Sequence, residues 1–282
     1  MLTDLKEKGY CIIANVLNED EILHATESFK KWYNSTPNLK LFHEKMDPHG
    51  IFKYHEVGHQ YFAWYLRTRP QIIDIFQQIW ETKDLVVSFD GCCYIPSGLN
   101  KKDNIWTHTD QASNNSELTC YQSYVSLTNN EKTTLIVYEG SHLLHQEYFK
   151  NKPKSSVNWN LIDDETLDKL KDSKKILKVN AGSLVIWDSR TFHQNCYGPP
   201  SEERLVQYLS YLPKQNPKNS KAMQTKRLKY FTEKRTTSHW AYPIRVNSLQ
   251  PQTYGDKSKL IDYSTLLEPN LEFLIESIKK LI

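Results

Sequence analysis

The hydrophobic and polar positions of the chain predict a helical beginning followed by a long series of short strands. Residues 10–17 are apolar and β-branched, which favours a strand. Asn18 and Glu21 have the spacing of a capping box, and the apolar residues that follow recur at helical spacing, so a helix is expected over about 19–33. Pro70 stands where a first-turn proline belongs, at the start of a second amphipathic helix.

From Asp84 the pattern changes to short strands that are separated by turn residues. The alternation is cleanest over residues 119–127, where Gln122, Tyr124 and Ser126 share one polar face. That face suits either an aqueous cavity that holds a dicarboxylate or an outer surface in solvent. The predicted strands cover residues 10–17, 85–95, 106–111, 119–127, 133–138, 176–179, 185–187 and 205–212.

Short strands behind a helical start, without βαβ alternation, indicate the fold class. We expect a mainly β protein with flanking helices, folded as a double-stranded β-helix, the jelly roll of cupin-like proteins. The whole chain, residues 1–282, is predicted to form a single domain with three parts. Residues 1–83 supply the first strand and the helices, residues 84–213 the jelly-roll catalytic core, and residues 214–282 a basic and helical extension.

Two charged segments lie outside the predicted strands. Residues 146–175 indicate a surface insertion of the kind that often covers the mouth of a jelly roll. Residues 214–235 are basic. We interpret their centre, about 219–232, as a solvated helix, although the same lysines would also suit the phosphate groups of a ligand. Apolar positions from Ser264 onwards predict an amphipathic helix that closes the chain.

Composition and charge narrow the class of protein. Hydrophobic residues make up 39% of the chain and aromatic residues 12%, enough for a sizeable core, and a net charge of +3 favours no nucleic-acid partner. No apolar run has the length of a membrane span, and the charged start does not resemble a signal peptide. Five cysteines without zinc-type spacing are expected to be buried, reduced thiols. We therefore expect a soluble cytoplasmic protein of unknown oligomeric state.

Three polar residues form a candidate metal site. His108 and Asp110 are two apart in a predicted strand, so both side chains point the same way. If an antiparallel strand brings back His193, two histidines and one carboxylate occupy one face of a metal, as in non-haem iron(II) oxygenases. The alternative is a surface strand with solvated side chains. Arg204 opens the apolar run 205–212, where burial is costly unless its guanidinium meets an anion such as a carboxylate.

Other polar residues are candidates for binding a substrate. Asp90 lies in a mostly apolar strand, where its carboxylate either pairs with the backbone or an arginine, or meets a cationic part of the substrate. Arg235, His239 and Trp240 belong to a loop without periodicity that could fold over the mouth of an active site. Residues 34–60 also contain histidines, which we interpret as satisfied or solvated side chains, one of which could line a pocket. They are His43, His49, His55 and His59.

Several segments, taken in their order and spacing, resemble the phytanoyl-CoA dioxygenase family of iron(II)- and 2-oxoglutarate-dependent oxygenases. They are Gly9–Leu17, Trp106–Gln111, Leu135–His142 and Gly182–Asn195, followed by Arg204. The resemblance implies that iron(II) is held by His108, Asp110 and His193 and that Arg204 binds the distal carboxylate of 2-oxoglutarate. It also implies that His142, in a structural Gly-Ser-His turn, is not a ligand.

Two further residues are candidates for the co-substrate site. Asn195 stands where relatives often have a hydroxyl residue, and we expect it to donate a second hydrogen bond to the distal end of 2-oxoglutarate. Gln122 lies on the polar face of its strand, which suits a dicarboxylate. Both assignments follow from the resemblance together with the position of each residue.

The resemblance implies a reaction as well. We expect O2 and 2-oxoglutarate to be consumed, succinate and CO2 to be released, and an unactivated C–H bond of a small-molecule substrate to be hydroxylated. A carboxylate at Asp110, rather than a small residue, favours hydroxylation over halogenation, while desaturation or cyclisation stays open. Two other classes remain as alternatives. One is a cupin-like metal-binding protein, an isomerase or sensor, without turnover of 2-oxoglutarate, and the other is an interaction module that binds no metal.

Overall fold

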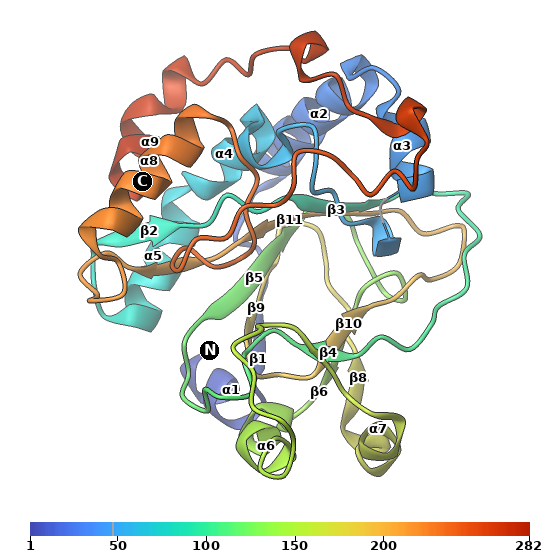
Figure 1. The fold of residues 1–282 in the computed structure, drawn as a ribbon, viewed down its shortest axis with the longest axis vertical. Helices are drawn as coiled ribbons and strands as arrows, with labels where there is room; N and C mark the ends of the chain where they lie inside the picture. The colour runs from blue at the N-terminus through green and yellow to red at the C-terminus, as the bar shows by residue number, and fades with distance from the viewer. Residues whose placement is uncertain (47) are drawn as a thin grey trace. The chain divides into compact units, whose positions relative to one another are not determined.

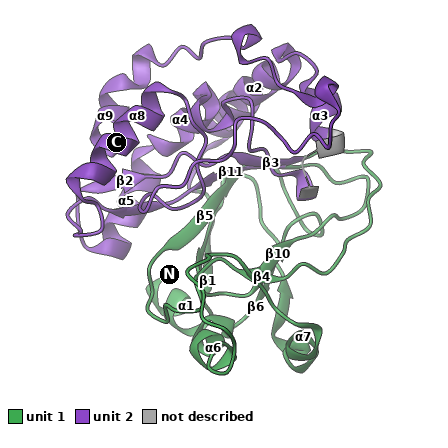
Figure 2. Cartoon of the chain, in the orientation of Figure 1, with its two compact units in different colours: residues 1–15, 95–204 green, residues 16–94, 205–282 purple. Residues whose placement is uncertain are grey.

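The computed structural model describes residues 1–46 and 48–282. These residues form two compact units, each built from an early and a late part of the chain (Figure 2). Unit 1 contains residues 1–15 and 95–204, and unit 2 contains residues 16–94 and 205–282. The division of the chain into one domain with three parts remains a prediction.

Unit 1 consists of short strands and a few helices (Figure 1). Its helices are α1 (Leu2–Glu7), α6 (Ser141–Tyr148), α7 (Asp164–Lys169) and the 3-10 helix η3 (Lys171–Ser173). Its strands are β1 (Tyr10–Ile13), β4 (His108–Thr109), β5 (Tyr121–Ser126), β6 (Leu135–Tyr138), β7 (Asn160–Leu161), β8 (Lys174–Ile176), β9 (Leu184–Asp188) and β10 (His193–Asn195). The predicted strands over 119–127, 133–138 and 185–187 are confirmed, with bounds that differ by one or two residues.

The strands of unit 1 pair in two antiparallel sets. In the first, β9 lies between β1 and β5, and Ser123 of β5 lies opposite Ile186 of β9. In the second, the order is β7-β4-β10-β6-β8, and His193 lies opposite both His108 and Val137. Residues that lie opposite one another in adjacent strands point to the same face of the sheet. His108 and His193 therefore share a face.

The other face of this second sheet is packed into a hydrophobic core. Ile136 and Tyr138 flank Val137 in β6 and therefore point away from the histidines. Tyr148 of α6 packs against the cluster to which they belong. The buried members of that cluster are Ile136, Tyr138, Ile162, Leu167, Phe192 and Cys196. The sheet thus has one apolar, covered face and one face that carries the two histidines.

Unit 2 contains most of the longer helices (Figure 1). Its α-helices are α2 (Glu19–Ser35), α3 (Leu39–Met46), α4 (Tyr61–Arg67), α5 (Pro70–Trp80), α8 (Lys221–Thr232) and α9 (Ile275–Leu281). Its 3-10 helices are η1 (Pro48–Gly50), η2 (Val57–His59), η4 (Lys257–Lys259), η5 (Tyr263–Thr265) and η6 (Glu272–Leu274). Strand β2 (Leu85–Val87) pairs with β12 (Tyr211–Pro213), and β3 (Cys92–Ile95) lies beside β11 (Arg204–Leu209). Ile95 and Arg204, at the ends of β3 and β11, are counted with unit 1.

Helix α2 begins with the capping box that the sequence predicts. The Asn18 side chain accepts a hydrogen bond from the backbone N–H of Glu21 at 2.9 Å, and the Glu21 carboxylate accepts one from the backbone N–H of Asn18 at 3.1 Å. The apolar side of the helix packs into an aromatic core. The ring centroids of Phe29 and Phe62 are 5.3 Å apart, and those of Trp32 and Phe52 are 5.5 Å apart.

The strand predicted over 85–95 is broken in the middle. β2 ends at Val87 and β3 begins at Cys92. Gly91 lies in the break, and a side chain there would meet the carbonyl oxygen of Phe52 at 2.0 Å, so the backbone lies close against another segment. A mostly apolar run that alternates only partly does not reveal such a close approach, which is why the prediction of one continuous strand was wrong here.

The helix predicted from Ser264 to the end of the chain is also wrong in extent. The last α-helix begins only at Ile275, and the residues before it form short 3-10 turns. Pro269 explains the delay, because proline lacks an amide proton and disfavours helical backbone in the residue before it. The first strand likewise ends at Ile13, earlier than the predicted residue 17.

The histidines of residues 34–60 are structural where they are buried. None of them belongs to the metal-binding group found among the described residues. His43 stacks on Phe52 with ring centroids 3.7 Å apart, and its Nε2–H donates to a backbone carbonyl. His59 is buried among aromatic rings, and its Nε2–H donates to the carbonyl of Arg235 at 3.1 Å. The interpretation of these side chains as satisfied is confirmed for His43, whereas His59 is satisfied only at Nε2, because its buried Nδ1 has no hydrogen-bond partner among the described residues.

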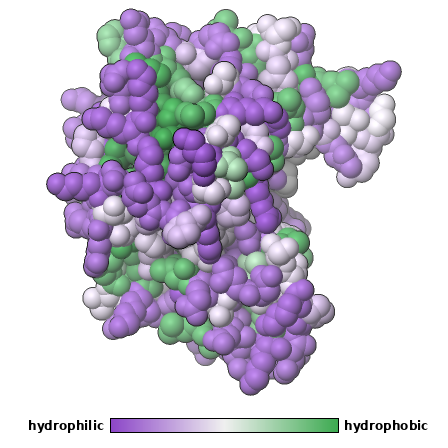
Figure 3. Space-filling model, turned by 60° about the vertical axis from the view of Figure 1, so that its left-hand side comes forward, coloured by the Kyte–Doolittle hydropathy of each residue, from purple (hydrophilic) through white to green (hydrophobic). Residues whose placement is uncertain are grey.

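Hydrophilic side chains dominate the face of the molecule in Figure 3, and apolar side chains gather there in smaller areas. The five cysteines are free and buried, as expected. Within the residues that the structure describes, no helix has both the length and the apolar composition needed to cross a bilayer. The cytoplasmic location remains a prediction.

The buried histidines predict a loss of stability in acid. Burial lowers the pKa of His59 to about 3 and that of His55 to about 4, from an ordinary value of 6.5. Below pH 6.5 the unfolded chain binds protons that the folded chain excludes, so the free energy of unfolding decreases from there down to about pH 3. Each histidine contributes up to about 1.4 kcal/mol per pH unit, His59 down to about pH 3 and His55 only down to about pH 4. Urea unfolding at pH 7.5 and pH 5.0 measures the effect.

The variant His59→Phe isolates one of the two groups. Between pH 7.5 and pH 5.0 it is expected to lose about 2 kcal/mol less than the wild-type protein, because its unfolded state no longer gains that proton. His24→Phe, which removes an exposed imidazole of α2, serves as the control and should keep the wild-type pH dependence. An identical pH dependence in His59→Phe and the wild type would contradict the assignment.

Candidate metal centre

Three side chains of unit 1 converge on one point. Asp110 Oδ2 lies 3.6 Å from His108 Nε2 and 3.4 Å from His193 Nε2. Each of the three residues offers one potential ligand atom, and these atoms all lie within 4.8 Å of one another. Among the described residues, His108, Asp110 and His193 are the group of histidine, cysteine and acidic side chains that meets this distance. The structure therefore brings together the three ligands that the sequence predicts.

Asp110 reaches this point from just beyond a strand rather than from within one. β4 ends at Thr109, and the backbone N–H of Asp110 donates to the carbonyl of Ser189 at 3.0 Å. Gln122 Nε2 donates to Asp110 Oδ2 at 2.9 Å. One contact fixes the backbone and the other fixes the carboxylate, so the position of Asp110 is set by two separate segments.

Each imidazole is oriented by a nearby backbone carbonyl. His108 Nδ1 lies 3.0 Å from the carbonyl oxygen of Trp106, and His193 Nδ1 lies 2.9 Å from that of Thr191. Because a carbonyl oxygen only accepts, Nδ1 carries the proton and Nε2 presents a lone pair toward Asp110. Burial lowers the pKa of His193, and His108 lowers it further, whereas Asp110 acts in the opposite direction. A neutral imidazole with this tautomer is the form that binds a metal ion.

The turn between β9 and β10 is held by a buried ion pair. Arg190 donates from Nε and Nη2 to the two carboxylate oxygens of Asp188, at 3.0 and 2.6 Å. The Asp188 side chain is only 2% exposed. Ser189, between them, donates from Oγ to Gln111 Oε1 at 2.8 Å and accepts the N–H of Asp110. The pair therefore fixes the turn that contacts the Asp110 segment and leads into β10.

Aromatic rings that the sequence did not reveal surround the two imidazoles. The ring centroid of Trp106 lies 4.8 Å from that of His108, and the centroid of Trp159 lies 5.6 Å from it on another segment. Trp187 lies 5.4 Å from His193. Trp106 stands two residues before His108, a spacing that could have indicated it. Trp159 and Trp187 approach only because distant strands pair, and no local signal indicates this.

The residues predicted to bind the co-substrate also belong to unit 1. Arg204 is fully buried, and its guanidinium carbon lies 5.2 Å from the ring centroid of Tyr124. Tyr124 shares a face of β5 with Gln122, which contacts Asp110. The three polar residues of that face are buried, so the alternative of an outer surface in solvent is wrong. Asn195 is buried at the end of β10.

Asp90 is paired inside unit 2. Arg67 Nη2 lies 3.6 Å from Asp90 Oδ1, and Ser88 Oγ donates to the same oxygen at 2.7 Å. Burial raises the pKa of Asp90, and the Arg67 guanidinium acts in the opposite direction. Of the two arrangements predicted for Asp90, pairing with an arginine is the one that the structure contains.

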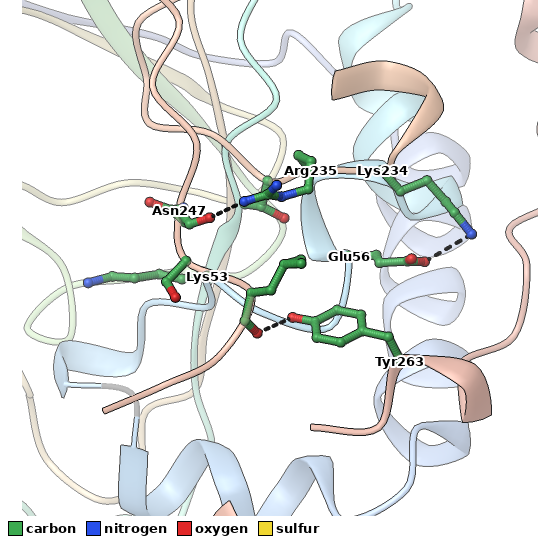
Figure 4. Close-up of a pocket in the computed structure, with 9 residues that line it drawn as sticks. Lys53, Glu56, Lys234, Arg235, Asn247 and Tyr263 are labelled. Atoms are coloured by element: carbon green, nitrogen blue, oxygen red, sulfur yellow. Dashed lines mark hydrogen bonds and ion pairs between the residues drawn. The ribbon is translucent and has the colours of Figure 1, made fainter. Parts of the chain in front are cut away.

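Arg235 lines a pocket of unit 2 (Figure 4). Its Nη2 donates to the carbonyl of Asn247 at 3.0 Å. Lys234, also at this pocket, lies with its Nζ 3.3 Å from a carboxylate oxygen of Glu56. Tyr263 also lines the pocket, and its hydroxyl donates a hydrogen bond to the backbone carbonyl of Leu249 at 2.6 Å. The pocket is therefore lined by charged groups of both signs.

His239 and Trp240 follow a few residues later in unit 2. Their ring centroids are 5.2 Å apart, and the Trp240 side chain is buried in the core. A role in substrate binding for Asp90, Arg235, His239 and Trp240 remains a prediction, as does a closure of this segment over the active site.

Comparison with known proteins identifies the family. Residues 5–195, more than half of the chain, match phytanoyl-CoA dioxygenase (PhyH). The chain belongs to the phytanoyl-CoA dioxygenase family. A relative in this comparison, the Ava biosynthesis cluster protein O of Aspergillus versicolor, is 30% identical over 251 residues, which cover 79% of this chain and 80% of the relative.

Solved structures share the fold of this PhyH-family chain. The epimerase SnoN, in complex with Fe3+, α-ketoglutarate and nogalamycin RO, has a TM-score of 0.52 at 16% identity and covers 75% of this chain and 81% of its own. HygX from Streptomyces hygroscopicus, with nickel and 2-oxoglutarate bound, has a TM-score of 0.53 at 11% identity and covers 76% of this chain and 86% of its own. The predicted fold class, a mainly β jelly roll with flanking helices, is confirmed.

The family supports the cofactors predicted from the sequence. Iron(II), 2-oxoglutarate and O2 agree with membership of the phytanoyl-CoA dioxygenase family and with the group of two histidines and one aspartate. Arg204 lies beyond the residues that match the family, so its assignment rests on its burial and its position in β11.

Arg190→Ala tests the ion pair in the turn before β10. It leaves the buried Asp188 carboxylate without its guanidinium partner, and we expect the free energy of unfolding to fall by about 2–4 kcal/mol. Lys150→Ala is the control, because its ion pair with Glu147 is exposed and should contribute less than about 0.5 kcal/mol. Urea denaturation followed by tryptophan fluorescence measures both. An Arg190→Ala variant as stable as the control would show that the turn does not depend on this pair.

Proposed function

We propose that this chain is an iron(II)- and 2-oxoglutarate-dependent dioxygenase that hydroxylates an unactivated C–H bond of a small-molecule substrate, with succinate and CO2 as co-products. In this proposal His108, Asp110 and His193 hold the metal. The observation that carries it is the convergence of their ligand atoms while both imidazole Nδ1–H groups are already engaged. When bound, iron(II) with 2-oxoglutarate supplies the activation of O2 that oxidises the C–H bond.

The donor set fits such a metal. Two imidazoles and one carboxylate on one side are the ligands typical of non-haem iron(II) oxygenases, which keep the remaining positions open. Bonds of about 2.0–2.2 Å to nitrogen and oxygen allow two ligand atoms to lie up to roughly 4 Å apart. The distances of 3.6 and 3.4 Å from Asp110 Oδ2 to the histidine nitrogens lie within this limit.

Arg204 is proposed to bind the distal carboxylate of 2-oxoglutarate. Its guanidinium is fully buried beside Tyr124, on the face of β5 that also carries Gln122. A buried cation is stabilised by an anion, and the planar guanidinium matches a carboxylate with two parallel hydrogen bonds. We assign Asn195 and Gln122 to the same subsite. The hydrogen bond from Gln122 to Asp110 gives Gln122 the further task of orienting the ligand carboxylate.

The relatives support a small-molecule substrate. The similar Aspergillus protein is named for a biosynthesis cluster, and the SnoN structure contains nogalamycin RO. SnoN is an epimerase, so proteins of this fold do not all end their reaction in an alcohol. We propose hydroxylation for this chain because it requires neither a second hydrogen abstraction nor a hydrogen donor on the protein.

Three residues of unit 2 are proposed to contact the substrate, namely Arg235, His239 and Trp240. For Asp90, the ion pair with Arg67 favours a structural role. We further propose a cytoplasmic location, which the free, buried cysteines support, because thiols stay reduced in that compartment.

Anaerobic titration with iron(II) and 2-oxoglutarate tests the ligand assignment. The wild-type protein is expected to develop the weak visible charge-transfer band of the iron–2-oxoglutarate chelate. His108→Ala removes one donor and should weaken iron binding by more than about tenfold, abolishing succinate formation in air. His24→Ala removes an exposed imidazole and should behave like the wild type.

Two results would contradict the proposal. Wild-type protein that is folded by circular dichroism, binds iron and gives no band would favour the cupin-like metal-binding protein without turnover of 2-oxoglutarate. Folded protein that binds no iron would favour an interaction module. Unchanged succinate formation in His108→Ala would show that the ligand assignment is wrong.

Variants of Arg204 separate co-substrate binding from metal binding. Arg204→Lys keeps the charge but loses the planar pair of donors, so the Kd of 2-oxoglutarate should rise about tenfold. Arg204→Met removes the charge and should raise the Kd further, while iron(II) affinity stays within about twofold of the wild type. Titration of the charge-transfer band measures the first constant, and anaerobic equilibrium dialysis measures the second. Equal 2-oxoglutarate affinity in all three folded proteins would exclude Arg204 from the site.

A further inference from the structure

An exposed tryptophan lies directly beside a candidate metal ligand. The ring centroid of Trp159 is 5.6 Å from that of His108, and the two planes are inclined by 35°. The Trp159 side chain is nevertheless 47% exposed. A large indole that keeps half of its surface in water next to a buried imidazole offers contact area to another molecule.

The segment that carries Trp159 is fixed by its polar neighbours. Asn158 Oδ1 accepts the backbone N–H of Ala112 at 3.1 Å, and Asn160 Nδ2 donates to the carbonyl of Gln111 at 3.1 Å. Asn160 also lies opposite Thr109 in the pairing of β7 with β4. The two asparagines therefore attach the backbone on both sides of Trp159 to the segment that follows His108.

The exposed apolar residues of this segment alternate with the asparagines. Val157 is 53% exposed and Leu161 is 54% exposed. Leu161 lies opposite His108 in the β7–β4 pair, so its side chain points to the face of the sheet that carries the histidines. Residues 157–161 contain no charged side chain. Trp159 and Leu161 form an apolar strip next to His108 rather than a site for a charged group.

Trp106, the other tryptophan beside His108, packs against the imidazole and is held there by a hydrogen bond. It stacks on the imidazole at 4.8 Å and 24°, and its Nε1–H donates to the carbonyl of Asn195 at 3.0 Å. The hydrogen bond and the stacking hold Trp106 against the ligand. Trp159 has the larger free surface and is the ring that another molecule can cover.

We propose that Trp159, with Leu161, binds an uncharged planar ring of the substrate, aromatic or conjugated, next to the metal centre. This inference rests on the proposed function and adds the substrate class. Planar rings gain offset or edge-to-face contact with indole beyond the burial of apolar area, whereas saturated rings gain only the burial. The strip therefore distinguishes a planar ring from a saturated ring of the same size.

A pair of uncharged probes tests the proposal on metal-free protein. Naphthalene-2-carboxamide and decahydronaphthalene-2-carboxamide share a carbon skeleton, but only the first is planar. The chain contains seven tryptophans, so 5-fluorotryptophan labelling gives seven 19F signals that single Trp→Phe variants assign. The naphthyl probe should shift the Trp159 signal saturably and bind about three- to tenfold more tightly than the saturated probe.

Variants identify the indole as the cause. Trp159→Ala should weaken binding of the naphthyl probe about three- to tenfold, followed through the Trp106 signal, and Trp159→Phe should lose less because it keeps a ring. Phe273→Ala removes another aromatic side chain, 89% exposed, and should leave binding unchanged. Equal affinity for the two probes, no shift at Trp159, or undiminished binding in Trp159→Ala would each overturn the inference.

The probe experiment is independent of the proposed function. It uses neither iron nor 2-oxoglutarate, so failure of the charge-transfer titration would leave its result intact. A chelate in the wild type without preference for the planar probe would reject the substrate class and retain the dioxygenase.

Discussion

The register of β4 against β10 is the constraint on which the metal group depends. His108 lies opposite His193 in this antiparallel pair, so the two imidazoles share one face, with ring centroids 4.4 Å apart. A shift of one residue would turn one of them to the opposite face, where β6 packs into the hydrophobic core. The candidate ligand set therefore exists in a single register of a strand that is only two residues long.

So short a strand is held in register chiefly by side chains. Gln194 Oε1 accepts hydrogen bonds from the Thr107 hydroxyl at 2.6 Å and from the backbone N–H of Trp106 at 3.2 Å. Gln194 and Thr107 are buried and directly adjacent to the two histidines in sequence. Buried polar groups are costly when unsatisfied, so these bonds disfavour any shifted pairing. The polar residues next to the two histidines thus help to position the ligands.

The sequence predicted the candidate ligands because their signals are local. His108 and Asp110 are two residues apart, and the apolar strand before His193 is easily recognised. The strand end at Thr109 and the break before Cys92 were not predictable, because they depend on contacts with Ser189 and with the Phe52 backbone. The periodicity of hydrophobic and polar residues along the sequence carries no information on such long-range contacts. For the same reason Trp159 and Trp187, the two aromatic neighbours of the imidazoles that lie far from them in sequence, became visible only once distant strands were paired.

We propose that β4 and β10 supply metal ligands and that the segment of Trp159 binds the substrate. This assignment agrees with the place of each segment in the sheet. β10 is an interior strand, paired on both sides, whereas β7 is an edge strand that pairs only with β4 among the described strands of its sheet. Replacing side chains on an edge strand disturbs few backbone hydrogen bonds. The exposed side chain of Trp159, just before β7, can therefore differ without changing the register that sets the imidazoles. In this proposal the metal ligands and the substrate-binding indole belong to different segments, so a substitution at Trp159 changes substrate binding and leaves the register of the ligands in place.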